Sequence, residues 1–491
     1  MKLRILLAAL LALLLAASLC SCGFIVLNDM SGQETEESAE ETETEKHVPE
    51  ITKFTKYRTR EDSKAISDAY LNELPGRDYE GAVFFLTTAD SHYIAPDETE
   101  SVVSRLAIQR NAEIEDRYNI TILIEVESPD EIREKLAQNI AADSFYSDLI
   151  MIPLYRTGEF QYGDLLLNMR TAPFFDITQP YFNSESSDMT SGGYRTYGIA
   201  GDATIEPTRF AALYFNRASL TGAGVDVEAL YNRTAAGQWT WDELLEIRSA
   251  VETVGSAGVT FSAADELAAR LPDLVFKSMG NLFVTSEARK VPMVGFTLRN
   301  GQSVLNVLSQ LYNNPTVQVR SEQDTAQLFA SGETAFRVDY LETMPTLTNA
   351  AVDWGVLPLP KAVAAQESYK TLADNNTLIF SIPKNHTNPE IPVIILSALN
   401  AASSGYFGDA YVEYNMMNVV RDNGTINMID LILKTASFDF ALAFGNAYPE
   451  IADATFRLIR DCAATNDLSA YYSERRAEAN RVMRENFDLT Y

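Results

Sequence analysis

The order of apolar and polar positions predicts alternating strands and helices from residue 81 onward. Residues 81–86, GAVFFL, form a short apolar run suited to a buried strand. A helical stretch at 108–118 follows, and residues 120–126 have the length and β-branched content of a second strand. The helical segment 130–142 then leads to a third apolar run at 147–152. This alternation predicts a parallel sheet covered by helices.

The rest of the chain continues with strand-like runs between helical segments. Strands are expected at 210–216, 334–338, 354–360 and 377–383, and helices at 324–330 and over most of 389–487. Thr240 and Glu243 have the spacing of a capping box, so a helix is expected to begin at Trp241. The prolines within 354–360 predict an edge strand. A body of about four hundred residues exceeds what one core usually serves, which predicts two lobes.

The N-terminal segment has the features of a cleaved signal peptide over residues 1–21. Lys2 and Arg4 precede an apolar run that is shorter than the ~20 residues a membrane-spanning helix needs. Its end resembles the signal of bacterial lipoproteins, in which the cysteine at Cys22 becomes the acylated, palmitate-carrying mature N-terminus. A plain secretory signal with incidental cysteines is the alternative. Acylation would anchor the protein to a membrane without spanning it.

Residues 22–77 are predicted to be an acidic tether and linker. Glutamates recur among Thr, Ser and Ala between residues 34 and 45, so this part has little apolar surface to bury. Such a segment stays extended by self-repulsion and holds the body away from the membrane. An acidic docking tail is the alternative interpretation.

The charge balance disfavours two classes of partner. The chain has 39 Lys+Arg against 68 Asp+Glu, a formal net charge of −29. This excess of negative charge disfavours binding to nucleic acid and to anionic lipid surfaces. Cys462 is the one cysteine of the body, so no intrachain disulfide is expected there.

Six short motifs, taken in order, resemble the extracellular solute-binding proteins of ABC importers that capture sugars and oligosaccharides. They lie at residues 110–120, 147–150, 212–216, 239–244, 328–335 and 355–360. The resemblance spans about residues 81–491. It implies an α/β, two-lobed, periplasmic-binding-protein-like (type II) fold with hinge crossings and a helical C-terminus. It also implies crossings near 206–211, 335–340 and 403–405, with lobe 1 formed by 78–207 plus 340–404 and lobe 2 by 208–339 plus 405–491.

Candidate ligand-binding residues follow the first and third predicted strands. Thr88 and Asp90 end the first strand, and Tyr155 and Arg156 follow the third. Ligands collect beyond the carboxyl ends of strands in open α/β sheets, because loops there present polar groups. A helix cap remains the alternative for Asp90, and a surface ion pair for Arg156.

The resemblance adds four candidates at the crossings and in the C-terminal region. Arg209 is expected to meet either ligand oxygens or an acid such as Glu206 or Asp339. Asp339 and Tyr340 end the expected second crossing, where an aromatic ring could stack on a sugar. Phe438 is a candidate cleft wall, with core packing as the alternative. The paired asparagines at 375 and 376 could point into the cleft, although they more often form a turn.

The predicted function is a lipid-anchored receptor, not an enzyme. It would capture a small solute, a carbohydrate, and deliver it to the permease and ATPase subunits of an importer. It would act as a monomer on the outer face of the cytoplasmic membrane of a monoderm bacterium, without cofactor or metal. The open alternatives are a surface ligand sensor or adhesin, and a glycan-active enzyme using paired carboxylates. The chain has no Gly-x-Ser-x-Gly or His-Glu-x-x-His motif, which argues against other hydrolases.

Overall fold

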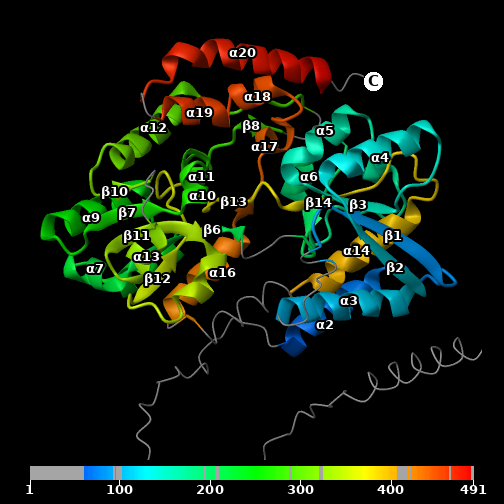
Figure 1. The fold of residues 1–491 in the computed structure, drawn as a ribbon, viewed down its shortest axis with the longest axis horizontal. Coiled ribbons are helices and arrows are strands. Elements are labelled where there is room, and N and C mark those ends of the chain that lie inside the picture. Colours follow the sequence, from blue (N-terminus) through cyan, green and yellow to red (C-terminus); the bar gives the residue numbers. More distant parts are fainter. Residues whose placement is uncertain are drawn as a thin grey trace, which may run out of the picture. The chain divides into compact units, whose positions relative to one another are not determined.

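Two separate β-sheets organise the protein (Figure 1). The computed structural model describes residues 60–91, 94, 102–191, 195–204, 209–286, 290–319, 324–405, 419–420, 422–463 and 466–487. These residues all belong to one unit, Glu50–Tyr491. The predicted signal peptide, Cys22 and the acidic tether up to residue 59 lie outside the described residues.

The first sheet has four strands in the order β14-β3-β1-β2. They are β1 (Ala82–Thr88), β2 (Ile120–Val126), β3 (Leu149–Pro153) and β14 (Leu378–Ser381). Strand β1 is parallel to both β2 and β3, as the alternating pattern predicts, whereas β14 is antiparallel to β3. The helices of this part are α2 (Arg60–Glu73), α3 (Val102–Tyr118), α4 (Pro129–Ala141), α5 (Thr157–Tyr162), α6 (Ser184–Ser191) and α14 (Glu390–Ser403).

Helices cover both faces of the first sheet, and β3 shows why its sequence is a continuous apolar run. Leu149 and Met151 belong to the core that α2, α3 and α14 close, while Ile150 and Ile152 belong to a smaller core under α4 and α5. Successive side chains of a strand point to opposite faces, so a strand buried on both sides has no polar position.

The second sheet has five strands in the order β10-β7-β11-β6-β12. They are β6 (Ala211–Asn216), β7 (Val259–Ala263), β10 (Val317–Gln318), β11 (Thr334–Tyr340) and β12 (Trp354–Leu357). Strand β7 is parallel to β10 and β11, and β6 is antiparallel to β11 and β12. Strand β12 is an edge strand, as its flanking prolines predict.

Many helices surround the second sheet and form the C-terminal region. They are α7 (Arg217–Gly222), α8 (Val227–Ala235), α9 (Trp241–Val254), α10 (Asp265–Ala268), α11 (Leu271–Ser278), α12 (Leu298–Tyr312), α13 (Thr325–Ala330), the 3-10 helix η5 (Leu341–Leu347), α16 (Asn423–Lys434), α17 (Phe440–Phe444), α18 (Pro449–Asp453), α19 (Phe456–Cys462) and α20 (Ser469–Asn486). Three two-stranded pairs complete the described strands: β4 (Phe182–Asn183) with β5 (Ala200–Gly201), β8 (Val284–Thr285) with β9 (Met293–Val294), and β13 (Thr371–Leu372) with β15 (Ala436–Ser437).

Helix α9 begins at Trp241, as predicted, but only half of the expected capping box is formed. The Thr240 side chain accepts a hydrogen bond from the Glu243 backbone N–H. The Glu243 carboxylate pairs with Arg233 at 2.6 Å instead of turning back to Thr240. A nearby cation therefore outcompetes the backbone N–H for the carboxylate.

The predicted end of the tether at residue 77 is wrong. Residues 60–73 form helix α2, and Leu71 of that helix is buried in the core that α14 shares. The segment is polar enough to read as linker, yet a few apolar positions on one face suffice to bind a helix to a domain. The folded part of the described chain therefore includes α2.

The predicted second crossing at 335–340 and the lobe boundary at 340 are also wrong. Strand β11 pairs with β6 and β7, and the chain returns through η5 to β12, which pairs with β6. Without β12, the second side of β6 would keep unpaired backbone groups. The chain reaches the first sheet only after β13, in the segment 373–377 that leads into β14.

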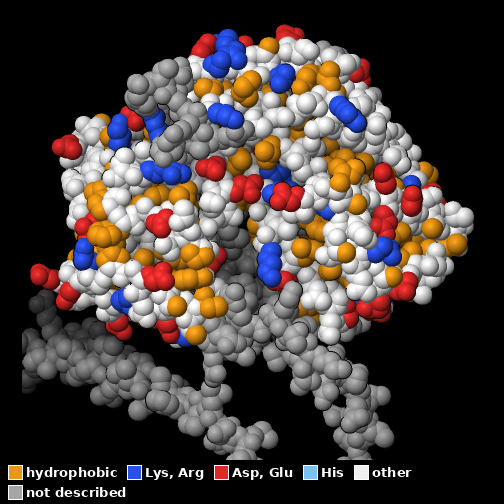
Figure 2. Space-filling view, turned by 180° about the vertical axis from the view of Figure 1, so that it is seen from behind, with side chains coloured by type: hydrophobic (Ala, Val, Ile, Leu, Met, Phe, Trp, Pro, Cys, Tyr) orange, Lys and Arg blue, Asp and Glu red, His pale blue; other side chains and the backbone are white. Residues whose placement is uncertain are grey.

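The surface mixes charged and apolar side chains. Figure 2 shows acidic and basic side chains interspersed with apolar ones on the face seen from behind. Within the described ranges, no helix combines the length and the apolar character needed to cross a membrane.

Replacing Ile152 by alanine is expected to destabilise the protein by about 2–4 kcal/mol, because it leaves a cavity in the small core under α4 and α5. Urea denaturation measures the change. Val126→Ala at the exposed end of β2 is the matched control and should change stability by less than about 0.5 kcal/mol. Equal losses in both variants would contradict the two-sided burial of β3.

Candidate ligand-binding site

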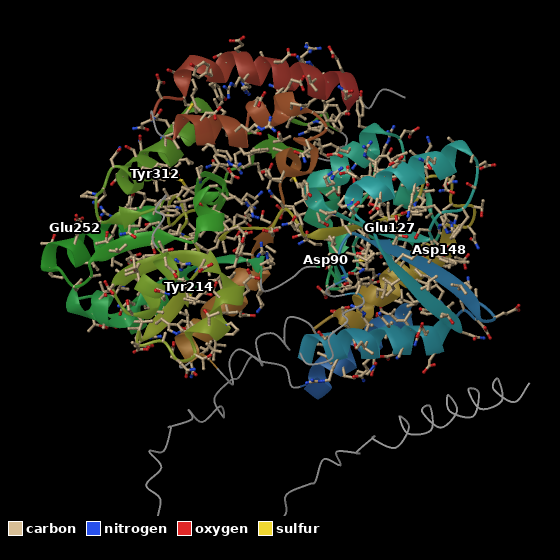
Figure 3. The ribbon with its side chains drawn as sticks, viewed as in Figure 1. Asp90, Glu127, Asp148, Tyr214, Glu252 and Tyr312 are labelled. Carbon is tan, nitrogen blue, oxygen red and sulfur yellow. The ribbon has the colours of Figure 1, made fainter. Side chains whose placement is uncertain are left out.

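Polar groups lie beyond the carboxyl ends of the first sheet's strands. At the end of β1, the buried Thr88 hydroxyl donates a hydrogen bond to the Asp90 carbonyl at 2.6 Å and accepts one from the Asp90 N–H at 3.3 Å. Thr88 thus shapes the turn, and the exposed side chain in this turn is that of Asp90 (Figure 3). After β3, the half-buried Tyr155 lies in the 3-10 helix η2 (Leu154–Arg156).

The corresponding edge of the second sheet carries an arginine stacked on a tyrosine. Arg209 precedes β6, and its guanidinium carbon lies 4.1 Å from the ring centroid of Tyr340 at the end of β11. The guanidinium also pairs with Glu266 and Glu342, at 2.7 Å each. A cation over an aromatic face is attracted by the ring quadrupole, so Arg209 is held from two directions. The two candidates Arg209 and Tyr340 are therefore brought together.

The segment 373–377 is bonded to this edge through Asp374. Its buried carboxylate accepts hydrogen bonds from Arg270 Nη1 at 2.8 Å and from the Tyr340 hydroxyl at 2.9 Å. Burial by itself raises the pKa of Asp374, but the charges of Arg270 and Arg209 and the hydrogen bonds outweigh it, so the pKa lies below its usual range. Burial raises the pKa of the Tyr340 phenol well above its usual value. Asp374 is ionised and Tyr340 is neutral at physiological pH.

The same segment is bonded to the edge of the first sheet. The Asn375 carbonyl accepts a hydrogen bond from the Tyr155 N–H at 3.2 Å, and the Thr377 carbonyl accepts one from the Leu154 N–H at 2.9 Å. Arg270 Nη2 donates to the Asn375 side chain at 3.3 Å. Residues 374–377 therefore connect the carboxyl-end regions of the two sheets.

Glu185 of α6 forms another polar contact with the second sheet's part of the chain, through Ser437 of β15 and Lys277 of α11. The Ser437 hydroxyl donates to the Glu185 carboxylate at 2.6 Å, and Lys277 Nζ lies 3.8 Å from the same carboxylate. Lys277 is fully buried and is 3.5 Å from Asp439, which caps α17. Burial raises the pKa of Asp439, although Lys277 opposes the shift.

Three further predicted residues are placed in structural roles. Arg156 pairs with Asp130 and Glu159 at 2.5 and 2.7 Å, which is the ion-pair alternative considered from the sequence. Phe438 is completely buried, and its carbonyl accepts a hydrogen bond from Lys277. Asp339 is also buried and pairs with Arg337 at 2.7 Å, on the face of β11 opposite to Tyr340. A ligand role for each of these residues remains a prediction.

Sequence reasoning missed the residues that organise the site. Arg270 lies at the start of α11, and Asp374 follows the short strand β13, so neither stands in a recognisable motif. Glu266 and Glu342 were not distinguishable among 68 acidic residues. The one available signal was the asparagine pair after Asp374, where the Asn376 N–H donates to the Asp374 carboxylate at 2.8 Å and forms the expected turn.

The arrangement is suited to reversible binding of a polar molecule. Exposed or half-buried acceptors and donors follow the strand ends of the two sheets or lie in the segment itself: Asp90, Tyr155, Glu266, Glu342 and Asn376. Carboxylates and amides of this kind form hydrogen bonds with hydroxyl groups, and tyrosine adds an apolar ring face. No cluster of three His, Cys, Asp or Glu residues able to hold a metal ion occurs in the described part of the chain.

Comparison with solved structures identifies the fold. The cyclic alpha-maltosyl-1,6-maltose binding protein of Arthrobacter globiformis aligns with a TM-score of 0.54 at 11% identity, covering 82% of this chain and 100% of that one. An extracellular solute-binding protein family 1 member from Alicyclobacillus acidocaldarius gives 0.51 at 15% identity, covering 82% and 98%. The galacto-N-biose/lacto-N-biose I-binding protein of a Bifidobacterium longum ABC transporter gives 0.51 at 14%, covering 84% and 99%. The predicted α/β, type II periplasmic-binding-protein-like fold is confirmed.

The sequence itself also matches a known family. No match was found among curated protein sequences. The model of the bacterial extracellular solute-binding proteins, however, matches residues 104–399, which is more than half of the chain and includes strands of both sheets. The chain therefore belongs to the bacterial extracellular solute-binding proteins, a family of binding proteins.

Proposed function

We propose that the protein captures a sugar or oligosaccharide beside residues 374–377 and delivers it to an ABC importer. The observation that carries the proposal is the double attachment of this segment, to Arg270 and Tyr340 on one side and to Leu154 and Tyr155 on the other. Two of the structural neighbours are described as binding maltosyl-maltose and lacto-N-biose, which supports a carbohydrate as the solute. The mixture of carboxylates, an amide and tyrosine suits a neutral polyhydroxylated ligand.

Binding would be coupled to a movement of the part of the protein around the first sheet relative to the part around the second sheet. Residues 374–377 are one of the segments that connect these two parts. A ligand that contacts both parts stabilises the closed form by its greater affinity for closed than for open protein. The ion pairs of Asp374 keep the segment 374–377 attached to the second sheet while the first sheet moves. The contact of the partly exposed Glu185 with the buried Ser437 hydroxyl would have to open in this movement.

We further propose that Cys22 carries a lipid that holds the protein at the outer face of the membrane. The residues around Cys22 resemble a lipoprotein signal, and the acidic segment that follows provides a spacer. Anchoring raises the effective concentration of the receptor near the importer. The importer subunits would recognise the closed, loaded form.

The carbohydrate class can be tested by thermal unfolding in the presence of mono- and oligosaccharides. A bound sugar at about 100 times its Kd should stabilise the protein by about 2.7 kcal/mol and raise the Tm, because it binds only the folded state. Tyr155→Ala should weaken this binding at least about tenfold. Tyr162→Ala, an exposed tyrosine of α5, is the matched control and should bind normally. A Tm shift with peptides but with no sugar would exclude the carbohydrate class.

Asp374→Asn is expected to destabilise the protein by about 2–4 kcal/mol at pH 7, because it leaves the Arg270 guanidinium without its carboxylate. The pKa of Asp374 is lower in the folded than in the unfolded state. The ionised carboxylate therefore contributes fully to the free energy of unfolding above about pH 4, and this contribution disappears as the pH falls further. The difference between wild type and variant in urea denaturation should therefore shrink below about pH 4.

Asp164→Asn is the control for this prediction. Asp164 pairs with Lys384 at the surface, where both side chains are exposed. Its replacement should cost less than about 1 kcal/mol. A similar loss in both variants, or a difference that does not depend on pH, would show that Asp374 is not held as an ionised carboxylate.

Cys22→Ala should release intact protein from cells into the medium, because the variant lacks the acylated residue. Immunoblotting of membrane and medium fractions measures the release, and metabolic labelling with palmitate should be lost. Cys20→Ala keeps the predicted lipidation site and should remain in the membrane fraction. Retention of Cys22→Ala in the membrane fraction would refute the lipid anchor.

A further inference from the structure

A cavity of about 160 Å³ opens on the second sheet between α13 and η5. Its lining comes from four elements: Tyr214 of β6, Arg337 and Asp339 of β11, Ala326, Gln327, Phe329 and Ala330 of α13, and Thr343, Thr346 and Leu347 of η5. Ala326, Gln327 and Thr346 are exposed, so the cavity is open to solvent at this rim. All of these residues belong to the described part of the chain.

The floor of the cavity is a buried ion pair. Arg337 donates through Nε to Asp339 Oδ2 at 2.9 Å, and its Nη2 lies 2.7 Å from the same oxygen. Arg337 Nη1 donates to the Thr325 hydroxyl, and Asp339 Oδ1 accepts from the Tyr340 N–H at 2.8 Å. Both charged side chains are about nine-tenths buried or more. Guanidinium has five N–H donors and a carboxylate about four acceptor positions, so both groups retain hydrogen-bonding capacity.

The walls of the cavity are mostly apolar. Phe329 and Tyr214 are buried and meet edge to face, with ring centroids 6.1 Å apart (Tyr214 is labelled in Figure 3). The small side chains of Ala326 and Ala330 leave room beside these rings. A cavity of about 150 Å³ can hold a benzene-sized ring. The space therefore matches one six-membered ring with its apolar side against the aromatic wall.

The cavity is separate from the candidate site at the strand ends. Side chains alternate along β11, so Arg337 and Asp339 face the cavity while Tyr340 faces Asp374 and Arg270. The two sites adjoin through the backbone of Tyr340. Its N–H is held by Asp339, and its carbonyl accepts a hydrogen bond from the Tyr214 hydroxyl at 2.9 Å.

We propose that this cavity is a second binding site, which takes a small neutral cyclic alcohol or polyol. Because Asp339 already neutralises Arg337, the floor offers donors and an acceptor side by side without a net charge. A hydroxyl group can accept from Arg337 and donate to Asp339 at once, whereas a carboxylate would be repelled by Asp339. The aromatic wall contacts the apolar side of the ring. This proposal holds whether or not the protein binds a sugar at the strand ends and delivers it to an importer.

Titration of the full chain with cyclohexanol tests the site. The measurement is the NMR chemical shift of the methyl groups of isotope-labelled alanines. The Ala326 and Ala330 signals should shift and saturate at a millimolar Kd, as is usual for a ligand of this size. Cyclohexanecarboxylate should bind at least about tenfold more weakly. Absence of saturable shifts at these two alanines up to about 50 mM would overturn the proposal.

Three variants separate binding in the cavity from binding elsewhere. Ala330→Leu fills the cavity and should weaken cyclohexanol binding at least about tenfold, and Ala326→Leu at the exposed rim is an alternative if the first variant folds poorly. Ala142→Leu, at an exposed position after α4, should bind normally. Asp339→Asn leaves the charge of Arg337 uncompensated, so it should reverse the preference in favour of the carboxylate. Unchanged binding in both filled variants, or an unchanged preference in Asp339→Asn, would refute the assignment.

Discussion

The buried carboxylate of Asp374 is the interaction on which the arrangement of the candidate site depends. An ionised group in the interior is costly unless charges and hydrogen bonds compensate it. Arg270, Tyr340 and the Asn376 N–H supply that compensation from three directions. Arg270 and Tyr340 belong to the part of the chain around the second sheet, and Asn376 lies in the turn itself. Their bonds to Asp374 therefore fix the place where the chain leaves the second sheet before it enters β14 of the first.

This constraint aligns two sheet edges that would otherwise be independent. The carbonyls of residues 375 and 377 accept hydrogen bonds from the 3-10 helix after β3, so the same four residues serve the first sheet. The segment thereby joins the edge that carries Tyr155 and Asp90 to the edge that carries Arg209 with its glutamates. A binding protein needs this property, since a ligand can favour closure only if it contacts both parts.

Strand β11 serves two purposes because its side chains alternate. Tyr340 contributes to the Asp374 network, while Arg337 and Asp339 line the cavity under α13. Tyr214 and Asp339 hold the backbone of Tyr340, so the end of β11 is fixed by bonds from the cavity side as well as from the segment 374–377. The surface ion pairs elsewhere contribute little energy, which makes these buried contacts the stronger positional constraints.

The sequence by itself determined the elements with strong local patterns. Strands β1, β2, β3, β6 and β11, the start of α9 and the edge position of β12 follow from apolar periodicity, capping residues and prolines, which act within a few residues. The family resemblance also predicted the fold correctly. Only the tertiary structure decided that α2 packs on the body, that the chain returns to β6 before crossing, and that Asp374 joins Arg270 and Tyr340. Those outcomes depend on partners that are between 34 and more than 300 residues apart in the sequence. No local pattern distinguishes one acid among 68 before the fold brings its cations to it.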